Sequence, residues 1–220
     1  MVPRVKICCI GNREEARTAI RLGASALGLV SEMPSGPGVI PEEAIRDIAT
    51  TVPPGVDSFL LTSRLEVESI VGQQRRTGVS TVQLVDALPG GAHQELRARL
   101  PGIRIVQVIH VLDEGSLEQA VKVGPHVDAI LLDSGNPNRA VKELGGTGRT
   151  HDWSLSRRIR ETVSVPVFLA GGLTPTNVRQ AIDRVSPFGV DVCSGVRTEG
   201  RLDPRKVEQF IRQAQGVAAD

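Results

Sequence analysis

Short apolar segments alternate with segments of helical spacing along the whole chain, and this alternation constrains the fold more than any other feature. The segments expected to form strands cover residues 5–10, 26–30, 57–62, 81–85, 103–111, 128–133, 166–170 and 189–193. The segments expected to form helices cover residues 13–22, 41–49, 65–76, 92–100, 116–123, 154–162, 175–184 and 204–215. The strand segments are apolar on both faces, which is typical of parallel strands covered by helices. Eight such units predict an α/β protein with a closed (β/α)8 TIM barrel, a single compact domain over residues 1–220.

A doubly wound open sheet is the alternative that fits the same alternation. That fold places a glycine-rich phosphate loop after its first strand, whereas the sequence CCIGNRE at residues 8–14 is not such a loop. No linker or low-complexity stretch divides the chain. The longest loop, residues 134–152, is rich in Gly and Asn. In a barrel it would overhang the C-terminal face, where active sites lie.

Charge and composition exclude several classes of function. The formal net charge is +1, aromatic residues make up 2% and Tyr is absent, so we expect no nucleic-acid partner and no binding to an anionic membrane surface. No apolar run approaches the length of a membrane span, and residues 1–11 lack the apolar core of a signal peptide. We therefore expect a cytoplasmic protein that acts on a small molecule, as a monomer or homodimer.

The three cysteines, Cys8, Cys9 and Cys193, predict neither a disulfide framework nor a metal site. Adjacent cysteines rarely pair, the count is odd, and no CxxC or Cys/His cluster suggests zinc. Side chains alternate across a strand, so Cys8 and Cys9 should face opposite ways. Spacing does not decide which of the two thiols faces the barrel mouth. Cys193 is expected to pack rather than to react.

Glycine-rich segments and one aspartate mark the predicted C-terminal face. The glycine-rich segments are GGTG at residues 145–148, AGGL at residues 170–173 and CSGV at residues 193–196. Glycine lets a ligand approach the backbone closely, and the loops after strands seven and eight of a barrel often bind phosphate. Asp133 ends the apolar run AILLD, where it is a candidate acid or base. An Asx turn into the next loop would explain Asp133 equally well.

A set of stretches in fixed order extends over essentially the whole chain. The stretches are VKICCIG, GASALGLV, TVQL, AILLDS, GGTGRTHDW, VPVFLAGGLTPTNV and GVDVCSGV, followed by a G-x-x-D turn at residues 200–203. With this set the chain resembles the phosphoribosylanthranilate isomerase family, (β/α)8 enzymes of tryptophan biosynthesis. The combination of GGTG-x-x-x-DW with LAGGL-x-P-x-NV makes the resemblance specific.

The resemblance implies an Amadori rearrangement of an aminoaldose phosphate to an aminoketose phosphate, without a metal or cofactor. It implies that Asp133 is the general acid, which protonates the ribose ring oxygen. Cys8, facing the barrel mouth, would be the general base that removes the C2 proton as a thiolate. Lys6, on the same strand face, would lower the thiol pKa and is a possible substrate-side residue. The glycine-rich loops would bind the substrate phosphate, here at Gly146, Gly171, Gly172, Ser194 and Gly195.

The chain departs from the family's pattern mainly on the side that receives the anthranilate group. The departures are Cys9 in place of glycine, PSGPGVI at residues 34–40 without the family's arginine, Val85 for histidine, Asp86 for glycine, His151 for phenylalanine and Arg197 for a common glutamate. A carboxylate without an arginine partner loses a strong charge-assisted pair. Asp86 would repel the anthranilate carboxylate if it pointed inward. Arg197 follows the phosphate loop, so phosphate binding is its expected role.

Three hypotheses are compatible with these residues. The first is a phosphoribosylanthranilate isomerase whose anthranilate pocket has drifted. The second is a paralogue with the same acid–base pair and phosphate site but a different phosphosugar or amino-sugar substrate. The third is a non-catalytic barrel that binds a phosphorylated ligand or a partner protein. The presence of both Cys8 and Asp133 argues against the third hypothesis, because a binding module needs neither.

Overall fold

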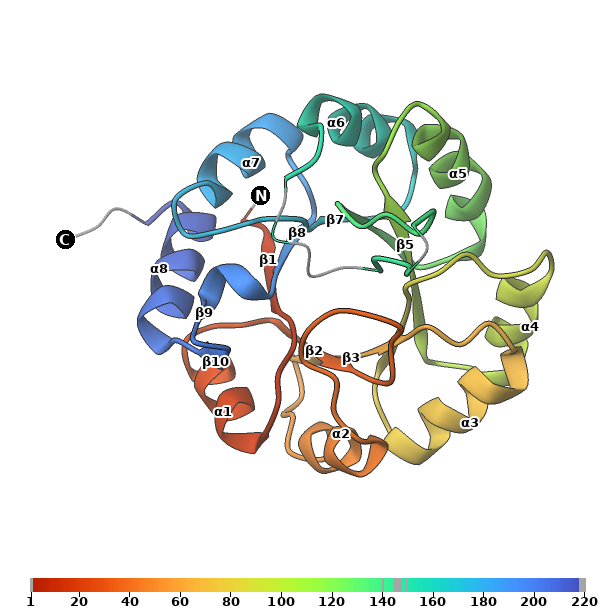
Figure 1. Ribbon diagram of the computed structural model, residues 1–220, viewed down its shortest axis with the longest axis horizontal. Coiled ribbons are helices and arrows are strands. Elements are labelled where there is room, and N and C mark those ends of the chain that lie inside the picture. Colours follow the sequence, from red (N-terminus) through yellow and green to blue (C-terminus); the bar gives the residue numbers. More distant parts are fainter. Residues whose placement is uncertain (1, 140, 145–147, 149, 218–220) are drawn as a thin grey trace.

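Eight parallel strands form a closed barrel in chain order, with β8 hydrogen-bonded back to β1 (Figure 1). The computed structural model describes residues 2–139, 141–144, 148 and 150–217. The strands are β1 (Arg4–Ile7), β2 (Ala26–Val30), β3 (Asp57–Thr62), β4 (Thr81–Leu84), β5 (Arg104–His110), β6 (Ala129–Asp133), β7 (Val167–Leu169) and β8 (Gly189–Val192). The predicted (β/α)8 barrel is therefore confirmed, and the open-sheet alternative is excluded.

Helices follow the strands and form an outer ring around them, as Figure 1 shows. They are α1 (Arg13–Arg21), α2 (Glu42–Ala49), α3 (Val67–Thr77), α4 (Ala92–Arg99), α5 (Gly115–Val123), α6 (Trp153–Thr162), α7 (Val178–Val185) and α8 (Pro204–Gln215). Side-chain caps begin three of them, because Asn12, Asp152 and Asp203 accept hydrogen bonds from the first free backbone N–H groups. In the described part of the chain, no helix has the length and apolar character needed to cross a membrane.

The strands bury both faces, and their alternation separates two groups of core residues. In β3, Leu60 belongs to the larger apolar cluster that strands share with the helices, whereas Phe59 and Leu61 belong to the smaller cluster in the barrel interior. The same alternation places Leu131 of β6 in the interior and Leu132 outside it. Side chains two residues apart in a strand share a face. The next inward-facing position after an interior residue, at the C-terminal end of the strand, therefore points into the barrel mouth.

Five strands end earlier than the sequence pattern predicts, β1 by three residues and β4, β5, β7 and β8 by one residue each. β1 ends at Ile7 and β8 at Val192, so Cys8, Cys9 and Cys193 lie beyond the strands. Cys9 has a φ of 61°, in the left-handed region that L-residues rarely adopt, and this turns the chain out of the extended conformation. After β8 the chain forms a short 3-10 turn, η2 (Ser194–Val196), and a small hairpin of β9 (Arg197–Thr198) and β10 (Arg201–Leu202) that the sequence did not predict.

Candidate active site

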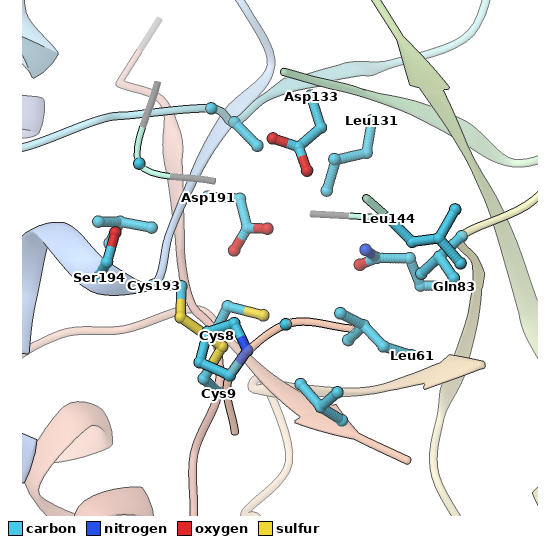
Figure 2. A pocket seen from close by; sticks show the side chains of 18 of the residues that line it. Cys8, Cys9, Leu61, Gln83, Leu131, Asp133, Leu144, Asp191, Cys193 and Ser194 are labelled. Carbon is cyan, nitrogen blue, oxygen red and sulfur yellow. A yellow bond between two sulfur atoms is a disulfide. The ribbon is translucent and has the colours of Figure 1, made fainter. Parts of the chain in front are cut away.

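One cavity lies at the C-terminal ends of the barrel strands and collects the predicted catalytic residues (Figure 2). Cys8 enters it from the end of β1, and Asp133 enters it from the end of β6. The loops after β7 and β8 contribute Gly171, Gly172 and Ser194. Figure 2 shows Cys8 and Asp133 on opposite sides of the cavity, with Asp191 between them in this view. An acid and a base on opposite sides of a cavity can donate and remove protons at two different atoms of one bound substrate.

Lys6 and Cys8 share the inner face of the barrel because they are two residues apart. Lys6 is fully buried, and its ammonium nitrogen lies 2.9 Å from Oδ2 of Asp191 in β8. Gly28 of β2 makes room for both side chains, since a Cβ at this position would lie 2.6 Å from the Cys8 sulfur and 3.0 Å from the Lys6 nitrogen. Residues of three neighbouring strands, β8, β1 and β2, therefore hold Lys6 next to Cys8.

Burial dominates the electrostatics of the thiol. Desolvation raises the pKa of Cys8 to about 11, and the positive charge of Lys6 only partly opposes this rise. Burial also works against the charged form of Lys6, but the Asp191 carboxylate and Cys8 together outweigh it and leave the Lys6 pKa above its usual value. Lys6 therefore lowers the Cys8 pKa as expected, but burial raises it by more.

Asp133 is buried at the tip of β6. Burial raises the pKa of its carboxyl group, while a hydrogen bond from the Ser134 backbone N–H, 2.8 Å from Oδ1, acts in the opposite direction. A raised pKa keeps a carboxyl group protonated at higher pH, which is what a general acid requires. This bond comes from the residue directly after Asp133, whereas an Asx turn uses the N–H two residues on, so the contact with Ser134 is not the turn-forming bond of the alternative interpretation.

The glycine-rich turns after β7 and β8 pack directly against each other. Asn177 joins the first turn to α7, since its side chain donates to the Gly172 carbonyl and accepts from the Thr174 N–H. Gly195 does not line the cavity itself, but a Cβ there would lie 2.0 Å from the Leu173 carbonyl oxygen. The close approach of the two turns therefore requires glycine at position 195. Gly146 lies outside the described residues.

Asp86 and Arg197 lie at the edges of the site, and both form ion pairs with other side chains. Asp86 lies outside the residues that line the cavity, and its carboxylate forms an ion pair with Lys142 of the loop after β6. Arg197 also lies outside the lining. Its guanidinium pairs with Glu15 of α1 at 2.9 Å and donates to the Cys9 carbonyl oxygen. These contacts place the Arg197 charge behind the turn after β8, between the end of β1 and the β9–β10 hairpin.

Two cavity residues were missed by the sequence analysis. Asp191 and Gln83 are 7% and 3% exposed, and both line the cavity. Asp191 Oδ1 and Gln83 Oε1 have no hydrogen-bond partner, although buried polar atoms are almost always bonded. Both atoms are thus free to accept hydrogen bonds from a ligand. The available signal was a polar residue inside each apolar strand segment, GVDVC and TVQLV, which alternation directs inward.

The cysteines differ from prediction in two ways. Cys8 and Cys9 both line the cavity, because Cys9 lies beyond the strand, where alternation no longer holds. Cys9 also forms a disulfide with Cys193, with Cα atoms 5.8 Å apart, while Cys8 stays free. The prediction of no disulfide was therefore wrong. It was drawn from chain spacing, whereas the barrel closure brings residues 9 and 193 together. Among the described residues, no cluster of three His, Cys, Asp or Glu side chains could hold a metal ion.

Comparison with known proteins decides the family. The family model for N-(5'-phosphoribosyl)anthranilate isomerase matches residues 5–213. The chain belongs to the N-(5'-phosphoribosyl)anthranilate isomerase family. It is 38% identical to the N-(5'-phosphoribosyl)anthranilate isomerase of Methanocella arvoryzae over 211 residues, which are 96% of this chain and 97% of the relative. The first hypothesis of the sequence analysis named this family, and the resemblance is confirmed.

Solved structures of the family have the same fold. The phosphoribosylanthranilate isomerase of Thermotoga maritima is 35% identical, with a TM-score of 0.84 and coverage of 97% of this chain and 99% of that one. A second family structure, 33% identical with a TM-score of 0.81 and the same coverage, is a complex with reduced 1-(o-carboxyphenylamino)-1-deoxyribulose 5-phosphate. By its name, that ligand carries both a phosphate and a carboxyphenyl group.

Proposed function

We propose that the protein isomerises N-(5'-phosphoribosyl)anthranilate to 1-(o-carboxyphenylamino)-1-deoxyribulose 5-phosphate, with Cys8 as general base and Asp133 as general acid. The membership of the family supplies the reaction, an intramolecular aldose–ketose isomerisation in tryptophan biosynthesis. The observation that carries the residue assignment is that a buried thiol from β1 and a buried carboxyl from β6 line one cavity together with the glycine-rich turns after β7 and β8.

The raised pKa of Asp133 suits the first proton transfer. The protonated carboxyl group gives its proton to the ribose ring oxygen as the bond from that oxygen to C1 breaks. The nitrogen lone pair forms a double bond to C1, which yields an open-chain cationic Schiff base. Burial of Asp133 favours this step because it raises the pKa of the donor toward neutrality.

The cationic intermediate favours the second proton transfer. Cys8 as thiolate takes the proton from C2, and the electrons of that C–H bond neutralise the Schiff base to give an enol, which tautomerises to the ketose. Burial disfavours the thiolate, with a pKa of about 11 in the free enzyme. A positive charge on the adjacent substrate nitrogen adds to that of Lys6, and both favour the thiolate when it is needed.

The remaining polar groups of the cavity suit the rest of the substrate. We assign the phosphate to the turns that contain Gly171, Gly172, Ser194 and Gly195, with Gly146 as a further predicted contact. Free backbone N–H groups in such turns bind anions. The unpartnered Asp191 Oδ1 and Gln83 Oε1 are hydrogen-bond acceptors, so we assign them to the hydroxyl donors of the sugar.

The anthranilate carboxylate has an unusual environment in this proposal. No Lys or Arg is among the described residues that line the cavity. Asp86 is offset by Lys142, so it repels the carboxylate less than an unpaired acid would. We retain Lys6, Asp86 and Arg197 as predicted substrate-side residues, with Lys6 acting through Cys8. We also propose that residues 1–220 act as one cytoplasmic barrel domain, monomeric or homodimeric.

Turnover of phosphoribosylanthranilate by the purified protein tests the proposal. We expect aminoketose formation by the wild type, and a fall in kcat of about 10²- to 10⁴-fold in both Cys8→Ala and Asp133→Asn, the usual effect of removing an acid or base. Circular dichroism of each variant controls for folding. A wild type that binds phosphate esters but turns over only aminoaldose phosphates without a carboxylate would replace this function with the second hypothesis.

A further inference from the structure

We propose that the Cys9–Cys193 disulfide positions the phosphate-binding turn against the catalytic base, so that substrate binding by this enzyme depends on the redox state of these two cysteines. The inference rests on the function proposed above. It concerns two residues that the reaction itself does not use.

The bridge joins the two chain segments that matter most to the site. Cys9 directly follows the base, Cys8, and Cys193 directly precedes Ser194 of the phosphate turn. All four residues line the cavity, and Figure 2 shows the bridge beside Cys8. The Cys8 N–H donates to the Val192 carbonyl at 2.8 Å, and this is the last backbone hydrogen bond between β1 and β8. The disulfide connects the same two segments one residue further along, beyond the ends of β1 and β8.

The backbone at Cys9 requires support. Its φ of 61° is costly for a residue with a Cβ, by about 1–2 kcal/mol. Besides the disulfide, a hydrogen bond from Arg197 to its carbonyl oxygen holds Cys9 in place. Without the bridge, Cys9 can relax toward ordinary backbone angles, and this relaxation moves the neighbouring Cys8. The turn at Ser194 then loses its covalent connection on the other side.

The chemistry of opening the bridge is ordinary dithiol exchange. A thiolate of an added dithiol attacks the sulfur of Cys193, which is the more accessible cysteine since it is only partly buried, and releases the sulfur of Cys9. The second thiol of the reductant then displaces Cys193 and closes its own disulfide, so two protons and two electrons pass to the protein. Cys8 does not compete, because burial keeps it in the unreactive thiol form.

Thiol counting and kinetics on the wild-type protein test the proposal without any variant. In denaturant without reductant we expect one reactive thiol per chain, that of Cys8, and three after reduction with a dithiol. Reduction should raise KM about threefold to tenfold with a smaller change in kcat, since small misplacements of binding groups weaken productive binding. Reoxidation should restore the original KM. Three free thiols in protein equilibrated with an oxidant, or the same KM in both states, would overturn the proposal.

Phosphate binding provides a readout that does not depend on turnover. Calorimetric titration with inorganic phosphate should give weaker binding to the reduced protein, by about the same factor as the change in KM. If neither state turned over phosphoribosylanthranilate but phosphate binding still differed, the proposed function would fail and the role of the bridge would stand. If turnover occurred with equal phosphate affinity in both states, the role of the bridge would fail alone.

A matched variant separates positioning from stability. Cys9→Gly combined with Cys193→Ser removes the bridge, and glycine adopts the φ of 61° without strain. We expect this double variant to have a raised KM that no longer responds to reductant. A double variant with a lower melting temperature but the wild-type KM would mean that the bridge serves stability only, against the proposal.

Discussion

The ammonium nitrogen of Lys6 lies 2.9 Å from Oδ2 of Asp191, inside a barrel where the Lys6 side chain has no solvent exposure. The ring of Phe59 completes this environment, with its centroid 5.3 Å from the same nitrogen. A buried pair of this kind compensates two desolvation costs at once, and losing one partner leaves the other charge isolated. The pair also places a fixed positive charge next to the thiol of Cys8, the proposed general base.

Lys6→Met should therefore destabilise the protein by about 3–5 kcal/mol, because it leaves the Asp191 charge buried and unpaired. Chemical denaturation measures this loss. Adding Asp191→Asn to Lys6→Met should recover part of it, since no unpaired charge remains. A Lys6→Met variant as stable as the wild type would mean that Asp191 is neutral in the native protein and that the pair is not ionic.

The thiol of Cys8 should titrate with a pKa of about 11 in the oxidised protein, where it is the free cysteine. Thiolate absorbance in the ultraviolet measures it directly. The base must be ionised, so this group makes kcat/KM rise with pH below its pKa, while ionisation of Asp133 acts in the opposite direction. Lys6→Met should shift the thiol titration to still higher pH. A Cys8 pKa at the ordinary thiol value would contradict the conclusion that burial dominates the electrostatics of this thiol.

His151 should make stability depend on pH between 6.5 and about 4, because burial lowers its pKa from 6.5 to about 4. In this window the unfolded state binds the proton and the folded state does not. The free energy of unfolding therefore falls as the pH falls, by about 3 kcal/mol in total, and is fully retained above pH 6.5. His151→Phe should remove this slope in denaturation experiments at several pH values. An unchanged slope would assign it to another group.

Glu15 should contribute stability that disappears at lower pH. Its carboxylate accepts hydrogen bonds from Arg197 and from the N–H groups of Gly11 and Leu202, and these contacts, opposed by burial, hold its pKa below 4.5. A lowered pKa means that this contribution is complete above pH 4.5 and is lost below it.

Glu15→Gln should cost about 1 kcal/mol at neutral pH, because the partly exposed ion pair is screened by solvent. It should also flatten the acid limb of the stability profile below pH 4.5, the usual pKa of a glutamate side chain. Glu14→Gln, at an exposed position of the same helix, is the matched control and should leave the profile as in the wild type. Equal profiles for both variants would show that the contacts of Glu15 do not stabilise the fold.

Gly195→Ala should weaken substrate binding more than it affects the fold. The new Cβ would lie 2.0 Å from the Leu173 carbonyl oxygen, so the two phosphate turns must move apart. We expect KM to rise about tenfold or more, as for other displaced binding groups. Gly90→Ala, which has no atom within 4 Å of its new Cβ, is the control and should keep the wild-type KM. A normal KM in Gly195→Ala would place the phosphate elsewhere.

Local pattern was sufficient for the barrel and for the inward direction of Asp133. Strand segments that are apolar on both faces indicate a parallel sheet covered on both sides, and the absence of a glycine-rich loop after the first of eight such segments favoured a closed barrel over an open sheet. Asp133 ends such a segment, and alternation from Leu131 already directs it inward. The glycine-rich turns were equally visible, because they follow the strands whose loops meet at one face.

Contacts between distant segments decided the rest. Spacing could not choose between Cys8 and Cys9, since the strand ends before both and a positive φ at Cys9 cancels the alternation. The Cys9–Cys193 bridge and the Lys6–Asp191 pair each join β1 to β8 across more than 180 residues of sequence, with separations of 184 and 185. The sequence by itself determined which residues within the strands face inward. Only barrel closure determined which of them meet, because the closing contact lies between the two ends of the sheet.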